Sequence, residues 1–252
     1  MIKVAKFGGS SLASATQFKK VSNIIFEDDD RRYVVPSAPG KRYDGDTKVT
    51  DMLYMCYNVA GKGGDFDLIL REIQERYQEI IDGLSLNLSL DQEFSEIHRQ
   101  IDNHAGIDYA ASRGEYLNGI LLANYLNYEF VDAAEVIFFR EDGSFDDEKT
   151  NNNLGKRLNK TKRAVIPGFY GMAPDGSIKT FSRGGSDITG SIVARAVHAD
   201  LYENWTDVSG FLVTDPHIVE NPEVISTITY KELRELSYSG ATVLHGDCIL
   251  PI

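Results

Sequence analysis

The hydrophobic positions of this chain switch repeatedly between the runs typical of strands and the spacing of three or four residues typical of helices. Strands are predicted at residues 2–7, 32–36, 130–131, 136–139, 164–167 and 178–181, with two more short strands within 201–215. Helical spacing is found at residues 18–25, 50–59, 69–84, 94–101, 117–121 and 188–197, and a last helix begins near 229. Four or more alternations of strand and helix predict an α/β fold, a three-layer α/β/α sandwich around a mainly parallel open sheet.

Length and composition indicate one large domain over residues 1–252, with hydrophobic residues at 42% of the chain and no repeats or linkers. The net charge of −12 leaves no global basic surface for nucleic acid. A local basic run at 156–163 is interpreted as a solvated helix face. The 2 cysteines suggest neither a disulfide framework nor a zinc site. No apolar run approaches the ~20 residues of a membrane helix. We therefore expect a cytoplasmic protein without a signal peptide, which contacts neither nucleic acid nor membrane.

The most distinctive stretch joins the strand at 178–181 to a helix through the adjacent pair Gly184–Gly185. Ser186 or Asp187 is predicted at the N-cap of that helix. Such a turn presents free backbone N–H groups and the positive end of a helix dipole, which together form an anion site. Arg183 and Asp187 flank the turn with opposite charges, which suits a small ligand that carries both signs. An ordinary βα turn with a good cap would give the same pattern.

A second strand–glycine–helix unit opens the chain. Lys6 ends the strand, and Gly8, Gly9 and Ser10 follow it. The pattern is not that of a Walker A loop. Backbone N–H groups from Gly8 to Ser10 are nevertheless predicted to bind oxyanions, with Lys6 as a point charge.

The next strand ends at Ser37 and is followed by a polar loop at 41–48 and a helix from about Thr50. Such a loop is either a mobile lid or a solvated connection. Thr50 either contacts a ligand or only starts the helix, and both interpretations stay open.

Ser112-Arg113-Gly114-Glu115 precedes an apolar helical run. Serine followed by glutamate three residues later is a capping box, which would only start the helix. Alternatively, Glu115 lies at the helix N-terminus, points into the cleft and binds an ammonium group. His98 and His104 are interpreted as surface or packing residues rather than metal ligands. Asp207 and Asp215 follow predicted strands, where carboxylates bind ribose hydroxyls or magnesium in a nucleotide site or cap turns.

Five motifs occur in one order along the chain, and together they resemble the aspartokinases, members of the amino-acid kinase superfamily. They are Lys-Phe-Gly-Gly-Ser-Ser (6–11), Ser-Arg-Gly-Glu (112–115), Arg-Gly-Gly-Ser-Asp (183–187), Trp-Thr-Asp-Val-Ser-Gly (205–210) and Gly-Ala-Thr-Val-Leu-His (240–245). The resemblance implies transfer of the ATP γ-phosphoryl group to the side-chain carboxylate of L-aspartate, with Mg²⁺. The product is 4-phospho-L-aspartate, on the route to lysine, threonine, methionine and diaminopimelate.

The resemblance also implies a role for each matching residue. Lys6 would neutralise charge on the transferring phosphoryl group, and Asp187 would orient Lys6 or the substrate, so these two are the expected catalytic residues. Arg183 would pair with the aspartate α-carboxylate and Glu115 with its α-ammonium. The expected phosphate-binding residues are Gly8, Gly9, Ser10, Gly184 and Gly185; the substrate-binding residues are Ser37, Thr50, Glu115, Arg183 and Ser186; the nucleotide-binding residues are Thr206, Asp207, Phe211, Asp215, His217 and Thr242. No residue is assigned as a metal ligand. The aspartate side is expected in the N-terminal part and the nucleotide side at roughly 200–252.

Two departures from the family pattern concern the nucleotide side. Thr242 and His217 stand where many aspartokinases have lysine and arginine, so two cations are missing near the ATP phosphates. Lys41, Arg42 or Lys48 from the polar loop would be able to compensate. The chain also stops where aspartokinases usually continue into two ACT domains. A catalytic domain without feedback control by lysine or threonine is therefore expected, and a homodimer is possible.

Two alternatives to an aspartate kinase remain. A kinase for another acidic amino acid would share the superfamily motifs, although Glu115 and Arg183 together favour a free α-amino acid. A non-catalytic module that binds nucleotide and amino acid is motivated by Thr242 and His217. Assays of substrate competition and of acyl phosphate formation separate the three hypotheses.

Overall fold

The computed structural model describes residues 1–182, 184–207, 210, 220, 223–229, 231, 232 and 235. Its main sheet has five strands in the order β3-β4-β2-β1-β7, and every neighbouring pair is parallel. The strands are β1 (Lys3–Phe7), β2 (Arg31–Pro36), β3 (Glu129–Phe130), β4 (Ala164–Val165) and β7 (Leu201–Trp205). A separate antiparallel pair is formed by β5 (Tyr170–Met172) and β6 (Ile178–Thr180).

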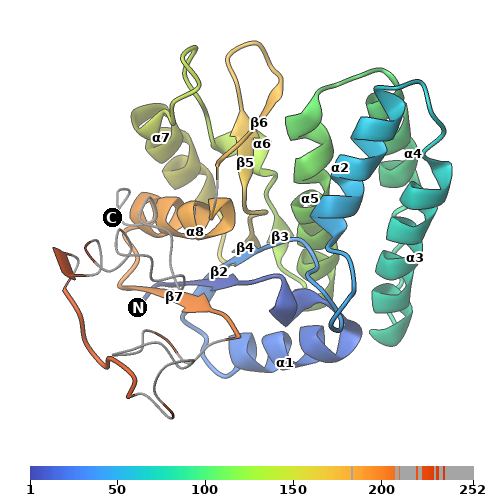
Figure 1. The fold of residues 1–252 in the computed structure, drawn as a ribbon. Helices are drawn as coiled ribbons and strands as arrows, with labels where there is room; N and C mark the ends of the chain where they lie inside the picture. The colour runs from blue at the N-terminus through green and yellow to red at the C-terminus, as the bar shows by residue number, and fades with distance from the viewer. Residues whose placement is uncertain are drawn as a thin grey trace.

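Helices cover both faces of the sheet, which confirms the predicted α/β/α sandwich (Figure 1). They are α1 (Ala15–Phe26), α2 (Val49–Ala60), α3 (Asp67–Gly83), α4 (Asp91–Asp102), α5 (Ile107–Leu126), α6 (Ala133–Val136), α7 (Asp147–Leu158) and α8 (Gly185–Ala196), with a short 3-10 turn η1 (Ser10–Leu12).

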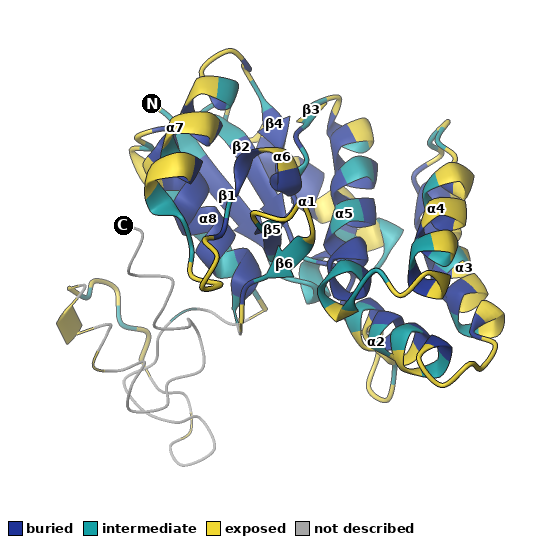
Figure 2. Cartoon of the chain, turned by 90° about the horizontal axis from the view of Figure 1, so that it is seen from above, coloured by how far each residue is buried: buried dark blue, intermediate teal, exposed yellow. Residues whose placement is uncertain are grey.

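The two faces of the sheet form two hydrophobic cores, because successive side chains of a strand point to opposite sides. Ala5, Phe7 and Val34 pack on the side of α1 and α5, with α2, α3 and α4 beyond them. Val4 and Val35 pack on the side of α6, α7 and α8. The central strands β1, β2 and β4 are therefore mostly buried, as parallel strands usually are, and Figure 2 draws most of their residues as buried, whereas the edge strands β3 and β7 are partly exposed.

Two predicted boundaries are wrong. The helix that carries Glu115 begins at Ile107, after Gly106 with a φ of 100°, and not at Ser112. The Ser112 hydroxyl donates to the carbonyl oxygen of Tyr109 at 2.7 Å, so it does not cap a helix. Glu115 therefore lies inside α5, where its side chain is buried rather than at a helix end.

The segment at 136–139 is the second error. The Asp132 side chain accepts a hydrogen bond from the Ala134 N–H and starts the one-turn helix α6. Phe138 and Phe139 form only isolated bridges. The next stretch turns back on itself, with an antiparallel bridge between Phe139 and Phe145, before the chain enters α7. Asp146 caps this helix by accepting from the Lys149 N–H.

Candidate active site

The carboxyl ends of β1, β2 and β7 open into a cavity of about 610 Å³. β2 lies on one side of β1 and β7 on the other, and open α/β sheets bind ligands at the carboxyl ends of strands where the order reverses in this way. Eight of the predicted site residues line the cavity. They are Gly8, Gly9, Ser10, Ser37, Thr50, Glu115, Thr206 and Asp207.

The turn after β1 combines free main-chain donors with a close approach of two loops. The Gly8 N–H continues the pairing with β7, whereas the N–H groups of Gly9 and Ser10 have no acceptor among the described residues. A side-chain carbon on Gly9 would lie 2.8 Å from the carbonyl oxygen of Ala38, and one on Gly40 would lie 2.6 Å from the Gly9 carbonyl carbon. Both positions therefore require glycine, and the two free amides are available to oxygens of a ligand.

The Lys6 ammonium group lies behind this glycine turn. It is on the face of β1 that α8 covers, it is buried, and its Nζ is 2.6 Å from Oδ1 of Asp187. The same Nζ is 3.8 Å from the place that a side-chain carbon on Gly8 would occupy. Lys6 does not itself line the cavity. The structure nevertheless brings the two predicted catalytic residues into contact beside a turn that does.

The carboxyl group of Glu115 contributes an acidic wall to the cavity. The side chain is buried, and its Oε2 has no hydrogen-bond partner among the described residues. Burial raises the pKa of Glu115 to about 8, and a hydrogen bond from the Ala38 main chain opposes that shift. A buried carboxyl oxygen without a partner is unfavourable unless a ligand supplies a donor. An ammonium group fits this position.

Three interactions that the sequence did not reveal hold this wall in place. Gly114 allows α5 to approach Ala38, since a side-chain carbon there would lie 2.7 Å from the Ala38 Cβ. The buried Tyr77 hydroxyl donates to the Gly114 carbonyl oxygen at 2.7 Å. Asn118, one turn further along α5, donates from Nδ2 to the Ser37 carbonyl oxygen at 2.6 Å. The apolar residues around Asn118 in α5 indicate that it is buried, but the sequence does not identify the Ser37 carbonyl oxygen as its partner.

The N-terminus of α8 differs from the prediction. Gly184 is the N-cap, in the left-handed conformation with a φ of 72°, so Ser186 and Asp187 lie in the first turn instead. Gly185 and Ser186 are buried against the turn between β4 and β5. A side-chain carbon on Gly168 would lie 2.6 Å from the Ser186 Oγ. None of these α8 residues lines the cavity, and their predicted roles with phosphate and substrate remain predictions.

The predicted nucleotide side is described only at its start. Thr206 and Asp207 follow β7 and line the cavity, and the Thr206 hydroxyl donates to Asp207 Oδ1 at 3.2 Å. The other predicted residues of this side, and the predicted partner of the substrate α-carboxylate, lie outside the described residues: Arg183, Phe211, Asp215, His217 and Thr242.

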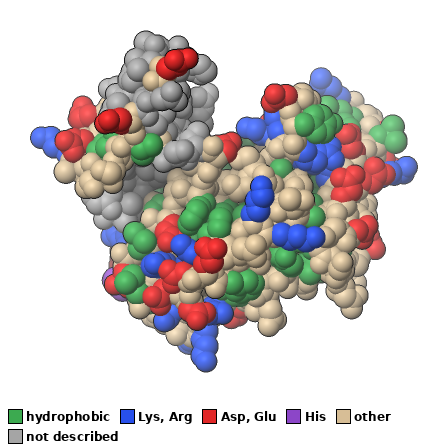
Figure 3. Space-filling view, turned by 90° about the horizontal axis from the view of Figure 1, so that it is seen from below, with side chains coloured by type: hydrophobic (Ala, Val, Ile, Leu, Met, Phe, Trp, Pro, Cys, Tyr) green, Lys and Arg blue, Asp and Glu red, His purple; other side chains and the backbone are tan. Residues whose placement is uncertain are grey.

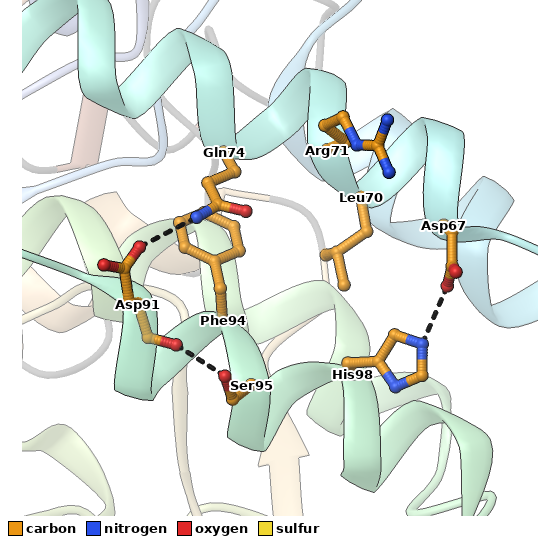
Figure 4. Close-up of a pocket in the computed structure, with 8 residues that line it drawn as sticks. All are labelled: Asp67, Leu70, Arg71, Gln74, Asp91, Phe94, Ser95 and His98. Carbon is orange, nitrogen blue, oxygen red and sulfur yellow. Dashed lines mark hydrogen bonds and ion pairs between the residues drawn. The ribbon is translucent and has the colours of Figure 1, made fainter.

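A second cavity, of about 460 Å³, lies between α3 and α4 and contains none of the predicted site residues (Figure 4). Asp67 and His98 close one end, with 2.8 Å between Oδ1 and Nε2, and Gln74 donates to Asp91 at the other. These contacts hold two helices together. His98 is accordingly a surface packing residue, as predicted. Within the described ranges, no three His, Cys, Asp or Glu side chains are grouped to hold a metal ion.

Charge is mixed rather than segregated on the face seen from below, where lysine, arginine, aspartate and glutamate side chains are interspersed (Figure 3). Among the helices that the structure describes, not one has the length and apolar character needed to cross a bilayer.

Comparison with known proteins places this geometry in context. The amino acid kinase family model matches residues 1–252. Aspartokinase 3 of Bacillus subtilis is 40% identical over 99% of this chain, which spans 58% of that relative. The crystal structure of Clostridium acetobutylicum aspartate kinase superposes with a TM-score of 0.94 at 55% identity, over 99% of this chain and 57% of that one. The crystal structure of E. coli aspartokinase III in complex with aspartate and ADP superposes with a TM-score of 0.82 at 28% identity. The match covers 100% of this chain and 59% of that one.

Proposed function

The chain belongs to the amino acid kinase family, and we propose that within this family it is an aspartate kinase. The proposed reaction transfers the γ-phosphoryl group of ATP to the side-chain carboxylate of L-aspartate and gives 4-phospho-L-aspartate. This is the first step toward lysine, threonine and methionine.

One observation carries the proposal. A single cavity contains the buried carboxyl group of Glu115, whose Oε2 has no partner among the described residues, and the free amides of Gly9 and Ser10. The acidic group suits the α-ammonium of an amino acid, and the amides suit phosphoryl oxygens. Donor and acceptor would therefore meet in the same space. The similarity to aspartate kinases of 28–55% identity supports the same assignment.

The residues present fit the demands of phosphoryl transfer, which needs positioning and charge neutralisation more than covalent chemistry. The aspartate side chain is already ionised at neutral pH, so a general base is not required. The Lys6 ammonium, oriented by Asp187, would offset the negative charge that develops on the transferring group. Ser37 and Thr50 line the cavity and would contact the amino acid.

ATP would enter from the side of Thr206 and Asp207. Mg²⁺ takes one or two carboxylates together with phosphate oxygens and water, so a site without a cluster of acidic ligands suits it. On this side of the cavity, the carboxylate of Asp207 would hold the Mg²⁺ ion. Bound Mg²⁺ would supply charge neutralisation at the phosphates. The substrate-binding roles predicted from the sequence are kept for Arg183 and Ser186. The nucleotide-binding roles are kept for Phe211, Asp215, His217 and Thr242.

The direct test is a hydroxamate assay of this 252-residue chain. Hydroxylamine traps an acyl phosphate, so aspartate, ATP and Mg²⁺ are expected to yield aspartyl hydroxamate. Glutamate and N-acetylglutamate serve as competing acceptors. Preferential use of either competitor would assign the chain to another acid kinase. Binding of ADP and aspartate without any trapped product would assign it to the non-catalytic alternative.

A further inference from the structure

Residues 40–48 connect β2 to α2 and bring positive charge to the cavity of an otherwise acidic protein; we call them the 40–48 loop. Lys41 and Lys48 both line the cavity and are exposed. Neither lysine forms an ion pair with any described carboxylate. Arg42, by contrast, pairs with Asp46 at 3.0 Å. The two lysines are therefore free to meet an anionic ligand.

A buried arginine of α3 binds both ends of this loop. Arg76 is 4% exposed. Its Nη1 donates to the Thr47 carbonyl oxygen and its Nη2 donates to the Gly40 carbonyl oxygen, each at 2.6 Å. Its Nη2 is also 3.5 Å from Oδ2 of Asp46, inside the loop. One guanidinium group thus connects the first residue of the loop to its penultimate residue.

The position of Arg76 is not explained by helix packing. Its neighbours on the buried face of α3, Ile73, Tyr77 and Ile80, are mostly apolar. Burial lowers the pKa of Arg76 and the Asp46 carboxylate opposes that shift. A buried charge is unfavourable unless it is paired and hydrogen-bonded. Here all the partners belong to the 40–48 loop, so the conformation of that loop is what the arginine determines.

The same loop is joined to the glycine turn after β1. The Gly40 N–H donates to the Gly9 carbonyl oxygen at 2.8 Å, and the two glycines approach too closely for a side chain on either. Lys41 follows directly. Arg76 therefore fixes Gly40, and with it the distance between Lys41 and the free amides of Gly9 and Ser10.

We infer that Arg76 is a positioning residue that holds the 40–48 loop so that Lys41 and Lys48 contact the oxyanions of the substrates. The inference rests on the proposed function. The shared chemistry is that of an oxyanion, and it occurs both in the phosphates of ATP and in the carboxylates of aspartate. Arg76 itself touches neither substrate, since it does not line the cavity.

The test compares Arg76→Met with Arg71→Met, which removes an exposed arginine from the same helix. The KM values for ATP and for aspartate, kcat and the melting temperature are measured at several salt concentrations. Loss of a charged hydrogen bond predicts a rise of about tenfold or more in at least one KM for Arg76→Met. Which KM rises identifies the oxyanion. Arg71→Met is expected to stay within about twofold of the parent protein.

Lys41→Met and Lys48→Met separate this role from a merely structural one. Both lysines are exposed, so these variants are expected to fold and to raise the same KM without lowering the melting temperature. Adding Lys41→Met to Arg76→Met should add little to the change caused by Arg76→Met alone, because Lys41 acts through the position that Arg76 gives it. Arg76→Lys keeps the charge but not the forked donors, and is expected to recover only part of the loss.

Binding of ADP and of aspartate is measured by calorimetry on the same proteins. If the parent protein binds both ligands and makes no acyl phosphate, the proposed function fails while the inference is still tested through Kd. If Lys41→Met, Lys48→Met and Arg76→Met all leave KM and Kd at the parent values, the inference is overturned. The inference is also overturned if the rise in KM caused by Arg76→Met is the same at every salt concentration, or the same with and without Lys41→Met.

Discussion

At the scale of single residues, Glu115 is the group whose ionisation should respond to the substrate. Its pKa is raised to about 8, because burial favours the neutral acid. An ammonium group binds the ionised form, so below pH 8 binding must release a proton. Aspartate affinity is therefore expected to rise with pH until about 8.

Calorimetry at pH 7 in two buffers of different ionisation enthalpy measures this proton release. Glu115→Gln should abolish the release and weaken aspartate by about tenfold or more, with little change in ADP binding. Equal binding enthalpies in the two buffers would argue against the proposed partnership between Glu115 and the ammonium group.

Replacing Lys6 should affect turnover much more than the binding of aspartate. Its Nζ is paired with Asp187 beside the glycine turn, where charge on the transferring group would develop. Lys6→Ala should lower kcat by roughly 10²-fold or more, as loss of a preorganised donor does. Aspartate affinity should change far less. A Lys6→Ala protein with near-normal turnover would refute the role given to this lysine.

At the scale of elements, the contact between the β1 and β2 loops is the least tolerant part of the site. A side-chain carbon on Gly40 would meet main-chain atoms at 2.6 Å, and main chain has little room to move. Gly40→Ala is expected to destabilise the protein by about 1–3 kcal/mol and to reduce activity further through the displaced glycine turn.

Gly61→Ala is the matched control for that change. It lies at the C-terminus of α2 with a φ of −63°, and the nearest atom to an added carbon is 3.4 Å away. Urea denaturation of both variants measures the difference. Equal free energies of unfolding for the two alanine variants would show that the loop contact is not tight.

Local sequence predicts the strand–glycine–helix units well, because hydrophobic period and glycine turns are local properties. It fails at α5, where a capping-box sequence lies inside a helix that begins at Ile107. The helix is buried on several sides, so its apolar pattern has no clear start. The prediction fails again at 136–139, because Asp132 starts a helical turn that extends to Val136, and Phe138 and Phe139 then form only isolated bridges.

At the scale of the whole molecule, Thr50 and Glu115 lie on helices and were indicated by the family resemblance. The site residues that follow β1, β2 and β7 were predictable because these are neighbouring parallel strands. Arg76 and Asn118 were not. Their partners are carbonyl oxygens 36 and 81 residues away, and main-chain acceptors leave no trace in the sequence. Tertiary contacts of this kind are visible only once the fold is known.

The free energy of unfolding should also depend on pH through Glu115. The carboxyl group titrates near 4.5 when unfolded and near 8 when folded. Between these values the unfolded chain has lost the proton that the folded protein keeps, so stability falls as pH rises. The slope contributed is at most about 1.4 kcal/mol per pH unit.

Urea titrations between pH 5 and 8 on the parent protein and on Glu115→Gln measure that slope. The variant cannot titrate, so its stability should fall less steeply over the same window. Parallel stability curves would mean that the Glu115 carboxyl group is better solvated than its burial implies.

The position of β1 in the sheet has a consequence for synthesis on the ribosome. One edge of β1 is able to pair with β2 soon after β2 has been synthesised. The other edge stays unpaired until β7, at 201–205, has been synthesised. At the usual 5–20 residues per second, translation of the intervening chain takes roughly ten to forty seconds. During that interval the middle of the future sheet has an unpaired edge, so the nascent chain is most open to aggregation and to chaperones just before its nucleotide side appears.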